Sequence, residues 1–243
     1  MLGAGMALAS ACPGTLIVQA ALGIRSGVFA LVGSILGGVI WSGFLRGSIR
    51  AKAEARKLKS QTSTLEGVLG VNTEAMVLLF ETLSVSLVGA VATYTDSPSW
   101  TVYPGFVGGF FIGAAQLFSL LTRKSMVGIS GSYEEAGNYI AWIMGGMTGT
   151  SKPAAYKNII FGVGAILGAS LLNLTAPQLV SEPVGHVSGS MAFVGGVLMT
   201  IGSRMAGGCT SGHGISGLSL MSTSSAVTIA STFAGGVLMA QLL

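Results

Sequence analysis

Residues 207–217 read GGCTSGHGISG and place one thiol and one imidazole among five glycines. The surrounding segment, from Met205 to Leu243, contains no Asp, Glu, Lys or Arg. Glycine lets backbone N–H groups approach a ligand closely, and a restarted helix offers free N–H groups that favour an anion. A thiol is a soft, weakly hydrogen-bonding group that suits transient contact with sulfur. The motif therefore predicts a path for a small sulfur-containing anion.

The chain has one other cysteine, Cys12, and it lies in a comparable break, ACPGT at residues 11–15. When the two cysteines are aligned, residues 5–15 and 202–212 each begin with a glycine seven positions before the cysteine. Such a match indicates an internal repeat, and transporters built from repeats place broken helices at the substrate site. For either cysteine taken alone, the alternative is a small buried hydrophobic residue.

The predicted substrate path consists of residues from the two breaks and their flanks: Cys12, Cys209, His213, Gly14, Gly208, Gly212 and Arg204. The imidazole of His213 either donates a hydrogen bond to the anion or braces the loop. Arg204 is an ionisable residue flanked by apolar sequence, and it either attracts the anion or extends to a membrane interface. No metal site and no cofactor are predicted.

Three further residues are predicted to support the path: Glu81, Ser130 and Glu134. Glu81 lies near the middle of an apolar run, where it pairs with a basic residue, braces the helix bundle or carries protons. Glu134 and Glu135 follow GISG at 128–131, where they either cap a broken helix or take part in transport.

The composition indicates an all-α polytopic protein of the plasma or inner membrane. Hydrophobic residues make up 51% of the chain and charged residues 8%, whereas a soluble domain has about 25% charged residues. Uncharged runs reach or exceed the roughly 20 residues that cross a bilayer core: 26–45, 97–122, 158–181 and 205–243.

The net charge of +4 does not indicate nucleic-acid binding, because half of the basic residues lie in one short segment. These are Arg46, Arg50, Lys52, Arg56, Lys57 and Lys59. A short basic segment between two spans is typical of the cytoplasmic face.

We expect four regions along the chain. Residues 1–46 form a partial first repeat, a broken helix followed by a span, and residues 47–72 form a basic cytoplasmic loop. Residues 73–94 are a connecting span, and residues 95–243 form the second repeat. Trp100 and Tyr103 are expected at a membrane interface. The first copy lacks a counterpart of GISGSYEEAG, which predicts a truncated chain or one piece of a larger assembly.

Together, GCTSGHGISG, ACPGT and GISGSYEEAG (128–137) resemble the YeeE/YedE family of sulfur-transport membrane proteins, whose characterised members take up thiosulfate. The resemblance implies pseudo-repeats whose broken helices enter an hourglass-shaped channel. It also implies that cysteines in the breaks, here Cys12 and Cys209, pass the anion along. Family members carry a further cysteine earlier in the first copy, and the corresponding place in the second copy offers only serine.

The leading prediction is a transporter, not an enzyme, for thiosulfate or a related sulfur anion, with a cytoplasmic sulfur-acceptor protein as a candidate partner. The chain has no P-loop motif, so uptake would depend on an ion gradient or on consumption of the anion. One alternative is a non-transporting remnant or an accessory subunit of a two-piece transporter. The other is a membrane sulfur-carrier enzyme with Cys209 as nucleophile and His213 as base, although the TSG between them favours a loop.

Overall fold

The computed structural model describes residues 1–55, 64–95, 105–145, 153–177 and 187–243. This part of the chain is helical, as predicted, with one isolated β-bridge between Thr64 and Ser222. The α-helices are α1 (Leu2–Ala9), α2 (Thr15–Ala21), α3 (Arg25–Ile40), α4 (Arg46–Ala55), α5 (Leu65–Leu69), α6 (Thr73–Tyr94), α7 (Gly105–Arg123), α8 (Ser130–Met144), α9 (Lys157–Thr175), α10 (Gly189–Ala206) and α11 (Thr223–Ala240). Two π-helical turns, η1 (Trp41–Leu45) and η3 (Thr210–Gly217), join or follow them. The predicted interfacial aromatics Trp100 and Tyr103 lie outside the described residues.

Five of the described helical segments are long and apolar enough to cross a membrane. They are Arg25–Ile49, Thr73–Tyr94, Gly105–Arg123, Lys157–Thr175 and Thr223–Ala240. Most of the residues in these spans are exposed, as lipid-facing helices require. The number and the apolar character of these helices indicate a multi-pass membrane protein.

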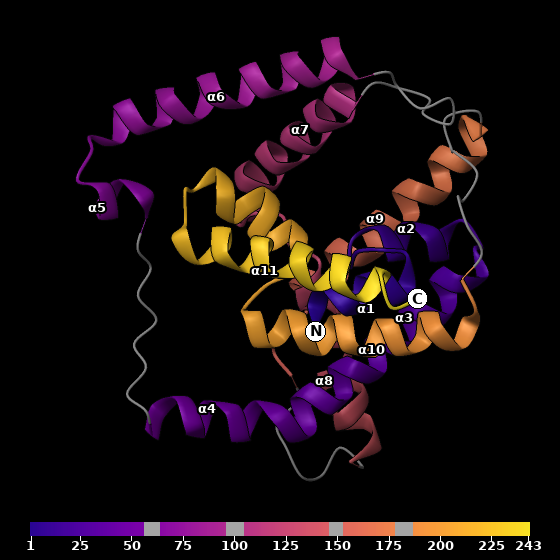
Figure 1. Cartoon of the computed structure of the whole chain (residues 1–243). Coiled ribbons are helices and arrows are strands. Elements are labelled where there is room, and N and C mark those ends of the chain that lie inside the picture. The colour runs from indigo at the N-terminus through magenta and orange to yellow at the C-terminus, as the bar shows by residue number, and fades with distance from the viewer. Residues whose placement is uncertain (56–63, 96–104, 146–152, 178–186) are drawn as a thin grey trace.

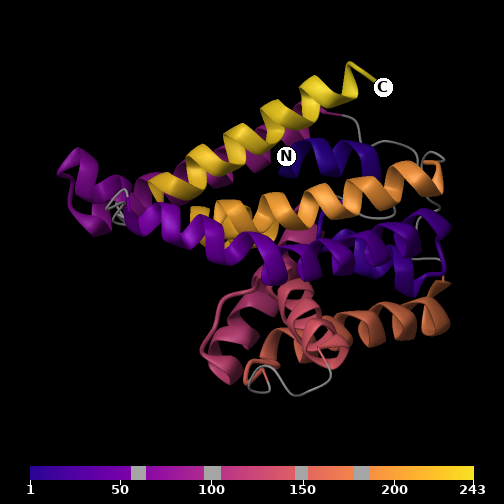
Figure 2. The same cartoon turned by 90° about the horizontal axis from the view of Figure 1, so that it is seen from below.

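The core is organised around α10, which lies beside α3 and carries α1 on another side (Figures 1 and 2). Glycines bring the α3 and α10 backbones together, because a Cβ at Gly33 would lie 2.1 Å from the carbonyl oxygen of Phe193. A Cβ at Gly196 would likewise lie 2.1 Å from the carbonyl oxygen of Ala30. Gly37 faces the same helix, since a Cβ there would lie 2.9 Å from the carbonyl oxygen of Val197 on α10, so small residues allow the close helix contact.

The short helix α1 packs against both α10 and α11 (Figure 1). A Cβ at Gly3 would lie 1.8 Å from the carbonyl oxygen of Thr232, and one at Gly5 would lie 2.6 Å from that of Gly195. These close approaches fix α1, and with it the break that follows at residues 10–14.

The first predicted break is present as two short helices. Helices α1 and α2 have 8 and 7 residues, about 12 Å or less each at 1.5 Å per residue, while a bilayer core is about 30 Å thick. Neither helix can span a bilayer alone. Entry of this pair into the membrane from one side stays a prediction.

The segment predicted as a basic loop at 47–72 is partly helical. The polypeptide continues from α3 through η1 into α4, which ends at Ala55, and α5 occupies Leu65–Leu69. Residues 46–55 read RGSIRAKAEA, and Ala, Arg, Lys and Glu are strong helix formers that continue a helix without an apolar face.

Glu81 lies on α6, outside the core. Its side chain is exposed, and it forms no ion pair within the described part of the chain. Neither a basic partner for Glu81 nor a bracing contact is seen among these residues, where α6 is little buried, and its predicted supporting role stays a prediction.

Candidate functional site at the two cysteine-bearing breaks

Cys209 lies where α10 ends and η3 begins. Gly207 ends α10 in the left-handed conformation, with φ of 84°, which glycine adopts without steric cost. The side chain of Cys209 is 1% exposed, and its Sγ lies 3.0 Å from the Oγ of Ser211. Ser130 and the backbone N–H of Gly212 also interact with this thiol. The thiol is thus enclosed by small hydrogen-bonding groups.

Cys12 lies in the break between α1 and α2 and is half-buried. Its Sγ accepts hydrogen bonds from the backbone N–H and the hydroxyl of Thr15, each at 3.4 Å. Its own N–H donates to the Thr15 hydroxyl oxygen at 2.8 Å. Gly14 is the N-cap of α2, and a Cβ there would lie 3.7 Å from the Cys12 sulfur, an ordinary contact.

The two breaks share a hydrogen-bonding pattern. The residue two positions before each cysteine, Ser10 or Gly207, is left-handed. The N–H of the residue just before each cysteine donates a hydrogen bond to the carbonyl oxygen six positions before that cysteine, on Met6 or Ser203. Each cysteine carbonyl then accepts from the N–H four residues on. This correspondence supports the internal repeat proposed from the alignment of residues 5–15 with residues 202–212.

The segment after Cys209 differs from the predicted loop. Residues Thr210–Gly217 form the π-helical turn η3, and the N–H of His213 donates to the carbonyl oxygen of Cys209 at 2.8 Å. Local glycine content predicts a loop here, but distant contacts hold the turn. The hydroxyl of Ser216 donates to Gln116 on α7 and to the carbonyl oxygen of Val127. The loop prediction is wrong for this reason.

His213 braces η3. Its Nε2 lies 3.0 Å from the carbonyl oxygen of Ala206, which can only accept, so Nε2 carries the proton. Its Nδ1 lies 2.8 Å from the hydroxyl of Ser225 on α11, which donates to it in the neutral imidazole. Of the two roles predicted for His213, bracing matches the structure. The imidazole does not pair with Cys209 as a catalytic base would.

Two of the predicted path glycines have different surroundings. A Cβ at Gly208 would lie 3.0 Å from the imidazole of His213, so this glycine makes room for the bracing ring. A Cβ at Gly212 would meet no atom within 4 Å. The backbone at Gly212 therefore adjoins open space beside Cys209.

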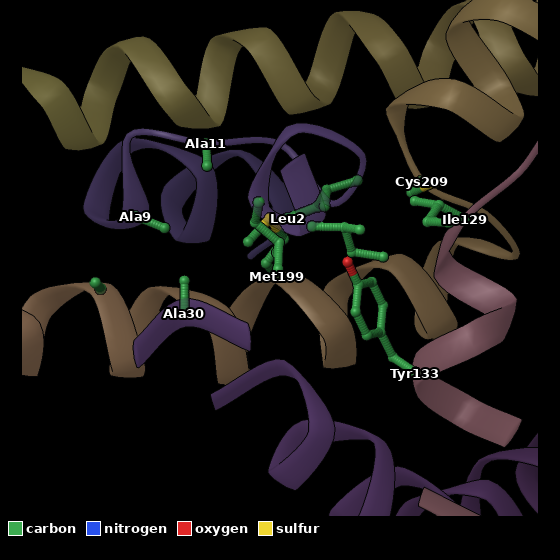
Figure 3. Close-up of a cluster of buried hydrophobic side chains, with 11 residues drawn as sticks. Leu2, Ala9, Ala11, Ala30, Ile129, Tyr133, Met199 and Cys209 are labelled. Atoms are coloured by element: carbon green, nitrogen blue, oxygen red, sulfur yellow. The ribbon is translucent and has the colours of Figure 1, made fainter. Parts of the chain in front are cut away.

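The start of α8 connects the two breaks. Tyr133 on α8 donates from its hydroxyl to the carbonyl oxygen of Pro13, next to Cys12. Ser130, the first residue of α8, interacts with Cys209. Figure 3 shows Tyr133 pointing from α8 into the buried cluster, with Cys209 and Ile129 at the edge of that cluster. Sequence reasoning missed Tyr133, although it is the one residue in GISGSYEEAG with both a large apolar body and a hydroxyl.

Arg204 lies in the last turn of α10 and points into the protein. Its Nη1 pairs with Glu134, its Nη2 donates to the Ser130 hydroxyl at 3.0 Å, and its side chain is 15% exposed. The predicted extension of Arg204 to a membrane interface is therefore wrong, because Glu134, 70 residues away in the chain, holds it inward. Ser130 and Glu134 both contact Arg204, and their predicted support of an anion path stays a prediction.

Glu135 caps a different helix from the one predicted. Its carboxylate accepts from the backbone N–H groups of Asn158 and Ile159 at 3.0 and 3.1 Å, in the first turn of α9. The Asn158 amide donates to it at 2.7 Å. A carboxylate at a helix N-terminus is stabilised by these free N–H groups and by the helix dipole.

Helical spans, two breaks between helices and a partly buried arginine that is paired within the protein are features of a membrane transport protein. The chain belongs to the Sulphur transport family, whose model matches residues 1–238. It is similar to the thiosulfate transporter TsuA of Spirochaeta thermophila (strain ATCC 700085 / DSM 6578 / Z-1203), with 26% identity over 240 residues, 92% of this chain and 69% of that protein.

Two probable transporters are also similar to this chain. They come from Xylella fastidiosa strains Temecula1 / ATCC 700964 and 9a5c, with 34% and 33% identity over 128 residues. In each case the match covers 53% of this chain and 84% of the relative.

Proposed function

We infer that this chain transports thiosulfate or a closely related sulfur anion across the cell membrane, through a path lined by Cys12 and Cys209. The observation that supports this proposal is the start of α8, which contacts both breaks. Tyr133 holds the backbone next to Cys12, and Ser130 adjoins Cys209. Two thiols 197 positions apart in the sequence thus each lie next to a residue that contacts the start of α8 or belongs to it.

The path replaces the hydration shell of the anion with weak donors. The thiol of Cys209, the hydroxyls of Ser130 and Ser211, and the backbone N–H of Gly212 can each donate to the anion. Such contacts are individually weak, which permits release, since conduction requires binding that allows exit. The anion passes without forming a covalent bond to either sulfur.

Arg204 supplies positive charge close to the thiol, with Ser130 between them: its Nη2 donates to the Ser130 hydroxyl, and Ser130 interacts with Cys209. Together with Arg46, which shares the Glu134 carboxylate with it, Arg204 leaves a net positive charge near the path, and this charge offsets part of the cost of taking an anion out of water. Uptake is driven by an ion gradient or by consumption of the anion by a cytoplasmic sulfur acceptor. A sulfur-carrier enzyme is not supported, because His213 bonds Ser225 and Ala206 instead of Cys209.

Thiosulfate-dependent growth of a host without its own sulfate and thiosulfate uptake tests this proposal. The host expresses the wild type, Cys209→Ser, the control Ser86→Ala on the exposed side of α6, or an empty vector, with membrane levels compared. We expect growth with the wild type and with Ser86→Ala, and little growth with Cys209→Ser.

Each other outcome of this growth experiment contradicts a defined part of the proposal. Equal growth with Cys209→Ser would remove this thiol from the transport mechanism. Failure of a well-expressed wild type to support growth would contradict thiosulfate as the substrate.

A further inference from the structure

Three charged side chains from three elements meet beside the second break. The carboxylate of Glu134, on α8, pairs through Oε2 with Arg204 on α10 and through Oε1 with Arg46, at 3.5 Å, where η1 meets α4. The side chain of Glu134 is 18% exposed, that of Arg204 15% and that of Arg46 36%. Two cations share one carboxylate, so the cluster carries a net positive charge.

On one side this cluster reaches the Cys209 thiol. The Nη2 of Arg204 donates to Ser130, and Ser130 interacts with Cys209. The Nε of Arg204 is buried and has no hydrogen-bond partner among the described residues. A buried guanidinium N–H without an acceptor is costly, so this nitrogen is an available donor for a ligand.

On the other side the cluster reaches a cavity. Arg46 lines a cavity of about 740 Å³ together with Ser42, Asn138 and Trp142. This volume exceeds what a small inorganic anion requires, and the lining includes hydroxyl and amide groups. A continuous series of polar groups therefore runs from the cavity through Arg46, Glu134 and Arg204 to the thiol.

We propose that Arg46 and Arg204 form a binding site for a small tetrahedral oxyanion between this cavity and Cys209, and that the Glu134 carboxylate occupies the site when no anion is bound. This inference rests on the proposed function, since the site would hold the transported anion on the cavity side of Cys209. A guanidinium presents a planar fork of donors that matches carboxylate and other oxyanions alike. An arriving oxyanion and Glu134 therefore compete for the same donors.

The competing carboxylate sets the affinity of the site. Without it, two partly buried guanidinium groups would hold a divalent anion tightly and slow its release. With it, each binding event must displace an existing ion pair, which keeps binding weak enough for passage. A purely structural ion pair, by contrast, would tie α8 to α10 and have no effect on anion affinity.

The test compares two neighbouring acids. Glu134→Gln keeps the shape of the side chain and removes its charge, so the affinity for thiosulfate and sulfate should rise by about threefold or more, the scale of a partly exposed ion pair. Glu135→Gln is the matched control, because Glu135 caps α9 and bonds neither arginine in the described structure. Affinity is measured on the purified full chain by thermal-shift titration with each anion, and KM by uptake into proteoliposomes.

A second variant covers the case in which Glu134→Gln does not fold. Arg46→Gln leaves the pair between Glu134 and Arg204 in place but removes one cation, and it should weaken anion binding by about threefold or more. Unchanged anion affinity in Glu134→Gln and Arg46→Gln, or an equal change in Glu135→Gln, would overturn the proposed site. A wild type that takes up no thiosulfate would refute the proposed function, while tighter sulfate binding by Glu134→Gln would still support this site.

Discussion

At the scale of single residues, Tyr133 joins the two halves of the candidate site. Its hydroxyl donates to the carbonyl oxygen of Pro13, and its side chain is 2% exposed. The carbonyl belongs to an irregular segment that has few backbone partners of its own, so a side-chain donor from α8 fixes it in place. The position of Cys12 therefore depends on a residue 121 positions away.

Tyr133→Phe should lower the free energy of unfolding by about 1–2 kcal/mol, because it leaves a buried carbonyl without its donor. It should also slow thiosulfate uptake, since the first break loses its fixed position relative to Cys209. Thermal unfolding in detergent and initial uptake rates in proteoliposomes measure the two effects.

Tyr139→Phe is the matched control for that experiment. Its hydroxyl also donates to a proline carbonyl, that of Pro153, at 2.8 Å, but away from both cysteines. Loss of stability without loss of uptake is expected for Tyr139→Phe. Equal slowing of uptake by both variants would show that Tyr133 acts on stability alone.

At the scale of helices, glycine determines how closely the core elements approach. The contact between α3 and α10 allows no Cβ at Gly196, which would lie 2.1 Å from the carbonyl oxygen of Ala30. Gly196 and the Ala30 carbonyl both belong to helix backbones, so the two helices themselves must separate to admit a methyl group. Helix α10 also carries Arg204 and ends just before Cys209, so displacement of α10 would move the candidate site.

Gly196→Ala should therefore destabilise the protein by about 1–3 kcal/mol, the usual cost of forcing extra volume into a packed core. Gly164→Ala on α9 is the control, because a Cβ there meets nothing within 4 Å. That variant should be neutral or slightly stabilising, since alanine favours a helix over glycine. Thermal unfolding of both variants tests this prediction. Equal melting temperatures for Gly196→Ala and Gly164→Ala would contradict the close packing of α3 and α10.

The sequence predicts the helices better than the contacts between them. Apolar runs gave the spans, and ACPGT marked the first break, since proline and glycine act on the chain locally. The turn η3 escaped prediction because Ser216 is held by groups about 90 and 100 residues away. The pairing of Arg204 with Glu134 and the capping of α9 by Glu135 were missed for the same reason: the partners are distant in sequence.

At the scale of the whole molecule, the first and last parts of the chain form one core. Helix α1 packs against α10 and α11, and α8 is bonded to both breaks (Figures 1 and 3). The matching hydrogen bonds before and after Cys12 and Cys209 place each thiol at the same point of a similar backbone turn. This arrangement supports one anion path that uses both thiols, which is the central proposal for this protein.

Uptake of radiolabelled thiosulfate into proteoliposomes tests that proposal most directly. The measurement compares the wild type with Cys12→Ser, Cys209→Ser and Ser86→Ala at matched protein content. A thiol-lined path predicts uptake by the wild type and Ser86→Ala, and loss of most of the initial rate in each cysteine variant. Full uptake by both cysteine variants would contradict it.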